Sequence, residues 1–317
     1  MSHNQVLIVG GGPAGAACAG RLIKNGVDCI ILDKQQFPRP KICAGWITPQ
    51  VLQDLEITPA EYPHQLTTFS SLQIYLNRIP ITKRGKQYAI RRVEFDHWLI
   101  RQSRSPVIYH EVKEINQINN GYQIDDQFSA DILIGAGGSH CPVYHQFFKD
   151  DQPRVGEKIV ALEEEYPADW VDGKCRLWFF ENGLPGYAWY VPKEGGYINI
   201  GVGGNERVLK ERSSTIHAQW MYFVDKLINI GLIENRTYNP EGYIYYLRSS
   251  QDNFQKDNVY LIGDAAGLAT LDMGEGIGPA IRSGILLAES ILKKTEYSIA
   301  EIGRFSLLPP YLRWLIS

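Results

Sequence analysis

Two short stretches of this 317-residue chain contain the residue types that could do chemistry. In the first, Gly10, Gly12 and Gly15 fill the pattern G-x-G-x-x-G. This pattern is typical of a turn that binds the pyrophosphate of a dinucleotide, because glycine lets a phosphate approach the backbone closely. The second stretch is GYAWYVPK, which predicts a strand with Tyr187 and Trp189 on one face. Taken alone, the second stretch is typical of a strand that packs into a core.

The sequence around the glycine triplet predicts the elements that dinucleotide binding requires. An apolar strand over Val6–Val9 precedes the glycines, a helix pattern with proline at its start follows them, and a second strand ends at Asp33. Asp33 lies 21 residues beyond Gly12, a spacing at which an acidic residue accepts hydrogen bonds from ribose hydroxyls. The helix N-terminus would turn unpaired N–H groups and partial positive charge toward the phosphates. The sequence therefore predicts dinucleotide binding, with NAD and FAD both open.

A segment near the C-terminus decides between these cofactors. NVYLIGDAAGLATLDMGEGIGPAIRSG predicts a strand, a G-D-A-A turn and a long helix that begins after a second glycine-rich turn. It resembles the G-D-A-A motif and helix start of flavoproteins with the para-hydroxybenzoate hydroxylase fold. The resemblance implies that Asp264 bonds the ribityl chain of FAD and that Gly276 and Ile277 face the pyrimidine edge of the flavin. A helix N-terminus at that edge would stabilise the negative charge of reduced flavin.

Two further motifs lie between these segments. R-x-x-F-D, at Arg92–Asp96, falls on a helix pattern, and the same resemblance implies that Arg92 lies near the FAD phosphates or the ribityl chain. ADILIGAGGSHCPV predicts a third strand and glycine turn, but His140 occupies the position of the last glycine in the dinucleotide pattern. The sequence therefore contains no evidence for a separate nicotinamide domain.

The motifs taken together resemble the geranylgeranyl reductase family of FAD-dependent oxidoreductases. PKICAGWITPQVL, GAGGSHCPV, GYAWYVPK with INIGVGG, and GDAAG with GEGIGPAIRSG occur in the order seen in that family. Tyr187, Trp189, Pro192 and Lys193 fill its Y-x-W-x-x-P-K signature. C-A-G-W departs from the glycine-rich continuation that usually follows the cysteine. The resemblance implies reduction of isolated carbon–carbon double bonds in a polyprenyl or other lipid-like substrate.

The resemblance also implies a set of site residues, none of which binds a metal ion. The predicted FAD-binding residues are Gly10, Gly12, Pro13, Ala14, Gly15, Asp33, Lys34, Ala44, Gly45, Arg92, Val112, Gly137, Gly263, Asp264, Gly274, Gly276 and Ile277. The predicted catalytic residues are Cys43, Tyr187 and Trp189. Hydride from flavin N5 needs a proton donor on the other alkene carbon, and Cys43 is the candidate, either directly or through a relay. Cys43 could equally be a small packed residue.

These motifs predict an α/β (α+β) fold, in which a Rossmann-like FAD-binding domain holds an inserted antiparallel β-sheet substrate domain. Stretches such as SLQIYLN, CRLWFF and YINIGV alternate in the manner of antiparallel strands. Apolar residues at helical spacing over 216–227, followed by Gly231, predict one helix among them. The predicted FAD-binding domain comprises residues 1–60, 88–152 and 252–317, the last including a C-terminal tail, and the predicted substrate domain comprises 61–87 and 153–251.

Charge and cysteine usage limit the partners and the compartment. The net charge is −3, and KRGK, which we interpret as a solvated loop, is too short to indicate nucleic-acid binding. Five scattered cysteines without a C-x-x-C pair are typical of a reducing cytosol. We expect a cytoplasmic protein, peripheral to a membrane where the apolar tail FSLLPPYLRWLIS contacts it. The electron donor is NADPH, NADH or ferredoxin, so an electron-donor protein is one expected partner.

Two other classes of function stay open. Flavin monooxygenases and halogenases have the same fold and act on aromatic or other apolar small molecules, and the halogenases carry a W-x-W-x-x-P-like strand. Tyr187 stands where that strand has its first tryptophan. The third class is a flavin-binding protein without enzymatic activity. Oxygen distinguishes the first two, because a monooxygenase or halogenase consumes it whereas a reductase works anaerobically.

Overall fold

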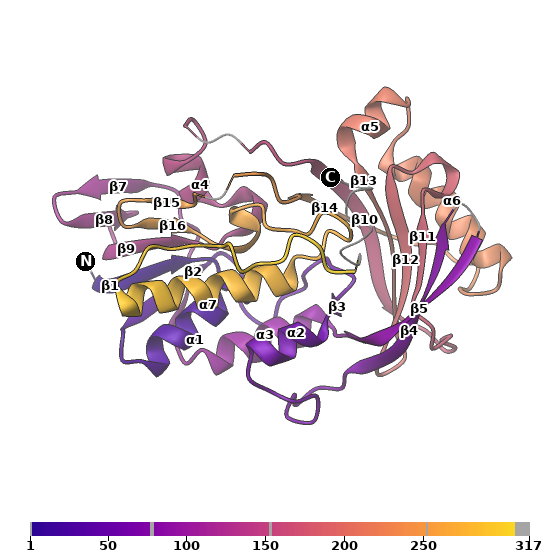
Figure 1. Cartoon of the computed structure of the whole chain (residues 1–317), viewed down its shortest axis with the longest axis horizontal. Helices are drawn as coiled ribbons and strands as arrows, with labels where there is room; N and C mark the ends of the chain where they lie inside the picture. Colours follow the sequence, from indigo (N-terminus) through magenta and orange to yellow (C-terminus); the bar gives the residue numbers. More distant parts are fainter. Residues whose placement is uncertain (1, 77–78, 152–153, 252, 308–317) are drawn as a thin grey trace.

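The computed structural model of the chain describes residues 2–76, 79–151, 154–251 and 253–307. Two β-sheets lie side by side, with helices α1 and α7 under the first and helix α6 on the outer side of the second (Figure 1). The predicted α/β fold, with a Rossmann-like part and a second sheet, is therefore confirmed.

The first sheet is built from apolar strands, and helices cover it. Its strands are β1 (Ser2–Val9), β2 (Cys29–Asp33), β6 (Val107–Tyr109), β7 (Ile115–Ile118), β8 (Gly121–Ile124), β9 (Phe128–Gly135), β15 (Gln255–Lys256) and β16 (Val259–Leu261). The order is β15-β16-β9-β1-β2-β6, and the four pairings from β16 to β6 are parallel. Both faces of a parallel sheet are usually covered, which explains why β2 is buried along its whole length.

The helices of this part pack close to the cofactor motifs. They are α1 (Pro13–Lys24), α2 (Pro49–Asp54), α3 (Arg92–Gln102), α4 (Pro142–Phe147) and α7 (Ile277–Lys293). Helix α1 packs against α7 and α3, while α4 packs against β9 and β16. The predicted order of strand, glycine turn, helix and second strand around the triplet is confirmed, as is the long helix after Gly276.

The second sheet contains eight strands in the order β14-β10-β13-β12-β11-β4-β5-β3. These are β3 (Trp46–Ile47), β4 (Thr67–Leu76), β5 (Ile79–Ala89), β10 (Lys158–Pro167), β11 (Arg176–Phe179), β12 (Gly186–Lys193), β13 (Tyr197–Asn205) and β14 (Glu241–Tyr246). Neighbouring strands are antiparallel except β4 and β11, which run parallel because the chain passes through the first sheet between them. The interpretation of KRGK as a loop is wrong, since residues 83–86 lie within β5.

The two faces of the second sheet bury different side chains. Helix α6 (Ile216–Asn229) covers one face, where Ala188 and Tyr190 of β12 pack with Trp220. On the opposite face Trp189 and Val191 pack with residues such as Leu72 and Met273. The alternation predicted for GYAWYVPK and the helix predicted over 216–227 are both confirmed. A shorter helix, α5 (Glu206–Glu211), follows β13.

The division of the chain into five segments stays a prediction. Strand β4 lies within the segment 61–87, and strands β10 to β14 lie within 153–251. Strand β3 comes from the segment 1–60, yet it pairs with β5 in the second sheet. The second sheet therefore also takes two residues from a segment assigned to FAD binding.

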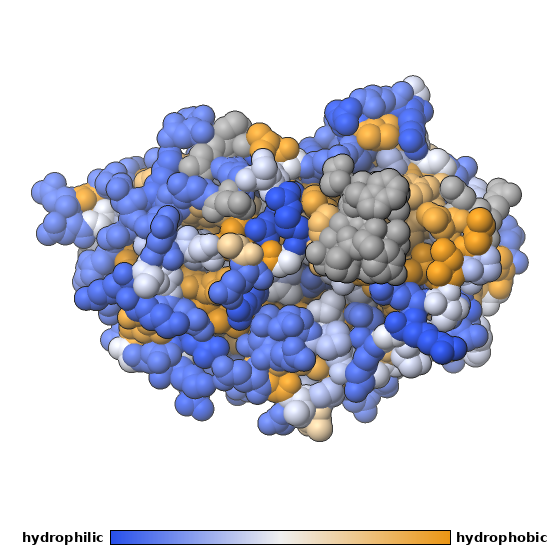
Figure 2. All heavy atoms as spheres, viewed as in Figure 1, coloured by the Kyte–Doolittle hydropathy of each residue, from blue (hydrophilic) through white to orange (hydrophobic). Residues whose placement is uncertain are grey.

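Apolar side chains reach the surface at the edge formed by β4, β5 and the end of β11 (Figure 2). They belong to Leu76, Ile79, Ile81 and Phe180. Among the described residues, no helix is both long and apolar enough to cross a membrane. Residues 308–317 of the tail with the predicted membrane contact lie outside the described residues. The peripheral membrane contact stays a prediction.

Candidate functional site

A cavity of about 430 Å³ is lined by residues of both sheets and of the turns between their elements. Of the predicted site residues, all but Gly15, Gly45 and Gly263 line this cavity. These three glycines lie beside it in α1, before β3 and after β16. The structure thus brings the motifs from both ends of the chain to one cavity, while their individual roles as ligands stay predictions.

One end of the cavity is built from the turn between β1 and α1. Gly12 precedes α1, which has neither a capping side chain nor an acidic residue in its first turn, so its first N–H groups have no side-chain cap. Asp33 at the end of β2 accepts a hydrogen bond from the Gly11 N–H at 2.8 Å. The Arg39 guanidinium lies 3.7 Å from Asp33 Oδ2, and its buried Nε has no hydrogen-bond partner among the described residues. A helix N-terminus beside this cation fits a dinucleotide phosphate.

Arg92 is a buried side chain and not a surface arginine. It forms two hydrogen bonds with Asp96, Nε to Oδ1 at 2.7 Å and Nη2 to Oδ2 at 2.8 Å. Burial acts to lower the pKa of Arg92, but the Asp96 carboxylate outweighs it and holds this pKa above its usual range. Arg39 Nη1 lies 3.8 Å from the same carboxylate. The two arginines therefore share the Asp96 carboxylate, and Arg39 also lies near Asp33.

The middle of the cavity holds a lysine, a tyrosine and an aspartate in contact. Lys41 Nζ lies 3.2 Å from the centre of the Tyr243 ring, and burial lowers the pKa of Lys41 to about 8. The Tyr243 hydroxyl donates a hydrogen bond to Asp264 Oδ2 at 3.0 Å. Helix α7 begins at Ile277, after the N-cap residue Gly276. The Asp264 carboxylate and the N-terminus of α7 therefore face the same part of the cavity, as the flavin motif implies.

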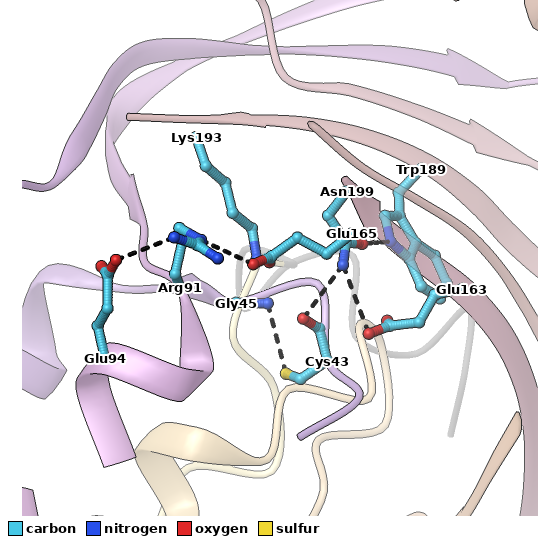
Figure 3. Close-up of polar contacts among 9 residues, drawn as sticks. All are labelled: Cys43, Gly45, Arg91, Glu94, Glu163, Glu165, Trp189, Lys193 and Asn199. Atoms are coloured by element: carbon cyan, nitrogen blue, oxygen red, sulfur yellow. Dashed lines mark hydrogen bonds and ion pairs between the residues drawn. The ribbon is translucent and has the colours of Figure 1, made fainter. Parts of the chain in front are cut away.

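The far end of the cavity is a polar network under the second sheet (Figure 3). The Trp189 indole Nε1 donates to Asn199 Oδ1 at 2.7 Å. The amide nitrogen of Asn199 donates in turn to Glu163 Oε1 at 3.4 Å and to the Cys43 carbonyl at 3.5 Å. Burial raises the pKa of the Glu163 carboxyl to about 7, although Lys193 and Asn199 oppose the shift. The network thus links the Trp189 indole, through Asn199, to the Glu163 carboxyl, whose pKa is about 7.

The lysine of the Y-x-W-x-x-P-K signature has a structural partner. Lys193 is 4% exposed and forms an ion pair with Glu165, to which Arg91 Nε also donates at 2.9 Å (Figure 3).

Cys43 is partly buried, and its Sγ accepts a hydrogen bond from the Gly45 N–H at 3.4 Å. This thiol also interacts with the Arg92 guanidinium. The structure thus places Cys43 between the two halves of the site.

A second buried acid lines the cavity in front of α7. The Glu275 carboxylate accepts a hydrogen bond from the Gly278 N–H at 2.6 Å, so it caps the helix. Burial raises the pKa of Glu275 to about 7, and the nearby carboxylates of Asp272, Asp54 and Asp264 add to the shift.

Sequence reasoning missed the cavity residues Arg39, Lys41, Glu163 and Glu275, and also Asn199, which lies behind the cavity and bonds Glu163 and the Cys43 carbonyl. Arg39 and Lys41 lie in FPRPKIC, an irregular stretch without a periodic pattern. Glu163 stands in the run LEEEY, where three successive glutamates resemble an exposed strand. The period of two in a strand was the available signal, since it points only one of two neighbouring glutamates toward the cavity.

Comparison with known proteins shows similarity to an FAD-binding family and to proteins named as reductases. Residues 3–56 match the family described as FAD binding domain. Digeranylgeranylglycerophospholipid reductase 3 of Methanosphaera stadtmanae is 26% identical over 334 residues, which cover 95% of this chain and 81% of the relative. A solved geranylgeranyl bacteriochlorophyll reductase-like protein from Thermoplasma acidophilum has a TM-score of 0.78 at 21% identity, covering 93% of this chain and 80% of that one.

The flavin-dependent brominase Bmp2 shares the fold, with a TM-score of 0.71 at 17% identity over 92% of this chain and 79% of that one. The fold alone is therefore common to reductase-like proteins and halogenases. The sequence is similar to the FAD-binding family over residues 3–56 and to the reductase relative over 95% of its length. The chain thus resembles FAD-dependent oxidoreductases that include the geranylgeranyl reductases.

Proposed function

We propose that this protein reduces carbon–carbon double bonds of a polyprenyl or other lipid-like substrate with reduced FAD. The observation that carries the proposal is the wall at the far end of the cavity. Tyr187 and Trp189 line it and pack in one apolar cluster with Phe179 and Met273. Such a wall suits an apolar chain lying beside the flavin, and the reductase relative is named for a lipid with geranylgeranyl chains.

Bound FAD in its reduced form would supply the hydride, and the groups that line the cavity would hold the cofactor and the substrate. The α1 N-terminus and Arg39 would hold the phosphates, while Asp264 would hold the ribityl chain. Tyr187 is fixed by its hydrogen bond to the Met273 carbonyl at 2.6 Å, so its ring stays at the wall. Aromatic faces there stabilise positive charge on the substrate by about 1–2 kcal/mol each once water is excluded.

The proton and the electrons need separate sources. Cys43 is one candidate for the proton donor, because it lines the cavity and its thiol lies beside Arg92. The electrons come from NADPH, NADH or ferredoxin, and the absence of a second G-x-G-x-x-G in the sequence favours a donor that docks transiently.

An anaerobic single-turnover experiment tests the proposal. Purified protein is loaded with FAD, reduced with dithionite and mixed with geranylgeraniol in detergent without oxygen. We expect the flavin absorbance to return and mass spectrometry to detect products with two added hydrogens per turnover. Flavin that stays reduced with geranylgeraniol and with a lipid bearing geranylgeranyl chains would contradict the proposal.

The shared fold of the brominase supports one alternative, a monooxygenase or halogenase acting on an aromatic or other apolar small molecule. Such an enzyme would consume oxygen in proportion to its product. Oxygen uptake coupled to hydroxylation or halogenation, without anaerobic turnover, would favour this alternative over the reductase.

A further inference from the structure

Glu163 is a carboxylic acid that lines the far end of the cavity next to the aromatic wall. We propose that Glu163 is the proton donor for the alkene carbon that does not receive the hydride. The proposal rests on the proposed reductase function and names the acid that this function requires. Glu163 comes from β10, a strand that carries none of the motifs in the sequence.

The contacts of Glu163 hold its carboxyl next to Trp189. Oε1 accepts from the Asn199 amide at 3.4 Å, and the same amide nitrogen lies 3.5 Å from the Cys43 carbonyl. Asn199 is completely buried and is itself fixed by the Trp189 indole at 2.7 Å. The carboxyl is thus attached to the wall that the substrate must touch (Figure 3).

The charges around Glu163 allow it to carry a proton at neutral pH. Burial raises its pKa to about 7, and the like charge of Glu165 adds to this shift. Lys193 on β12 and the hydrogen bonds from Asn199 and the Cys43 backbone act in the opposite direction. Tyr245 on β14 also faces this carboxyl. An acid with a pKa near the working pH is the most effective proton donor in general acid catalysis.

Other proton-bearing groups of the cavity fit the role less well. The Tyr187 hydroxyl donates to the Met273 carbonyl, and burial raises its pKa well above the usual value. Lys41 lies against the Tyr243 ring and interacts with Asp264, the acid of the G-D-A-A turn. The Cys43 thiol already accepts a hydrogen bond from the Gly45 N–H at 3.4 Å and interacts with the Arg92 guanidinium. Glu163 combines a position at the wall with a suitable acidity.

The proposed step balances in atoms and electrons. The π pair of the alkene forms a C–H bond to the Glu163 proton, and the other carbon takes the hydride that reduced FAD supplies. The products are the saturated bond, oxidised FAD and the Glu163 carboxylate. Proton uptake from water then restores the acid, and the electron donor restores reduced FAD.

A first experiment measures the proton on Glu163 without turnover. Infrared difference spectra of the FAD-loaded protein are recorded between pH 5 and pH 9, for the wild type, Glu163→Gln and Glu275→Gln. We expect the wild type to lose carboxylic acid C=O bands near pH 7, and each variant to lack one of them. If Glu163→Gln keeps every band of the wild type, Glu163 carries no proton in this range and the proposal is overturned.

A second experiment measures the step itself, as the anaerobic reoxidation of reduced flavin by geranylgeraniol. The wild-type rate should fall as the pH rises through about 7, because only the protonated acid donates. Glu163→Gln should be about 100-fold slower or more and should lose this pH dependence, with FAD still bound. Glu163→Asp, which keeps the acid should Glu163→Gln fail to fold, should retain both the infrared band and the pH dependence.

The outcomes separate the two proposals. A wild type that never reoxidises with the alkene contradicts the reductase function, whatever the infrared bands do. A wild type that reoxidises while Glu163→Gln keeps its rate and pH profile overturns only the role of Glu163. In that case Cys43→Ser, measured in parallel, shows whether the thiol donates the proton.

Discussion

The two ends of the cavity are built in different ways. The end that faces the predicted phosphates comes largely from one stretch, residues 6–39, and presents backbone N–H groups at the start of α1. The opposite end takes side chains from three strands of the second sheet and the backbone carbonyl of Cys43. The proposed cofactor end is therefore largely a local structure, whereas the proposed substrate end exists only once the sheet has formed.

The two buried glutamates that line the cavity, Glu163 and Glu275, differ in the same way. Glu275 is held by a backbone N–H three residues along the chain, and Glu163 by the amide of Asn199 on a neighbouring strand. The pKa of each is raised to about 7 by burial. The partner of Glu275 lies in the helix that follows it, whereas the contacts of Glu163 with Asn199 and the Cys43 backbone require the second sheet and the loop before β3.

The largest loss of stability is expected from Gly10→Ala, a change at the end of the cavity that faces the predicted phosphates. Gly10 has φ +114°, and an added Cβ would lie 2.4 Å from the backbone carbonyl oxygen of Ala136. Strain at this φ and the backbone clash should together cost about 4 kcal/mol of unfolding free energy. Urea denaturation measures this loss, and FAD should no longer copurify.

Gly26→Ala is the matched control for backbone strain alone. Gly26 has φ +77°, but an added Cβ would meet nothing within 4 Å. Its cost should be about 1 kcal/mol, with FAD retained. Equal losses for the two variants would mean that the close approach to Ala136 does not matter.

At the substrate end we expect the next largest effect from Gly201→Ala. An added Cβ would lie 2.2 Å from Cζ2 of Trp189, so the indole would have to leave Asn199. Overpacking and the lost hydrogen bond should lower the unfolding free energy by about 3 kcal/mol and change the tryptophan signal in near-UV circular dichroism.

Gly203→Ala tests the same face of the same strand. There the nearest atom to an added Cβ is Cζ3 of Trp189 at 3.4 Å, an ordinary contact. The loss should stay below about 1 kcal/mol, with the tryptophan signal unchanged. A similar signal change in both variants would contradict a specific role for Gly201 in seating the indole.

This difference between the two ends also explains how far the sequence could be interpreted. The glycine triplet, Asp33 and the G-D-A-A turn lie within local strand–turn–helix units. The spacing of residues within such a unit predicts which groups lie close together. The alternation in β12 likewise predicted the two faces on which Trp189 and Tyr190 lie. Such patterns need no knowledge of which strands pair.

The site residues that the sequence did not predict depend on which strands pair, and no local sequence pattern specifies the pairing of strands. Glu163 meets Asn199 because β10 pairs with β13 in a register that places Glu163 opposite Gly201. The parallel pairing of β4 with β11 joins strands about 100 residues apart in the chain, roughly the size of a small domain. The strand at KRGK was missed because most of its residues are exposed, so no apolar alternation marks it.

A smaller effect is expected from the pH dependence of stability in Glu275→Gln. The folded chain holds the Glu275 proton up to about pH 7, whereas the ordinary pKa is 4.5. The contribution of Glu275 to the free energy of unfolding is therefore fully present below its ordinary pKa of 4.5 and is lost as the pH rises through about 7. At about 1.4 kcal/mol for each pKa unit, the wild type should lose roughly 2 kcal/mol from Glu275 between pH 5 and pH 8.

Urea denaturation of the wild type and Glu275→Gln at pH 5 and pH 8 measures this difference. Glutamine keeps an oxygen for the Gly278 N–H, so the cap remains and only the titration is removed. The variant should lose less stability than the wild type over this range. Parallel pH profiles for the two proteins would mean that Glu275 is already ionised at pH 5 in the folded state.

The smallest effect concerns FAD affinity, where the two ends meet at Asp264. Removing its carboxylate in Asp264→Ala should weaken FAD binding about tenfold, because one hydrogen bond to a charged group is lost. Tyr243→Phe keeps this carboxylate but removes the hydroxyl that donates to it at 3.0 Å, so binding should weaken by about threefold only. Isothermal titration of the FAD-free proteins with FAD measures both constants. Equal weakening would indicate that Asp264 acts through Tyr243 and the packing around it, and wild-type affinity in Asp264→Ala would remove Asp264 from the cofactor site. A larger loss of FAD affinity in Asp264→Ala than in Tyr243→Phe is expected only if the Asp264 carboxylate itself contacts the cofactor.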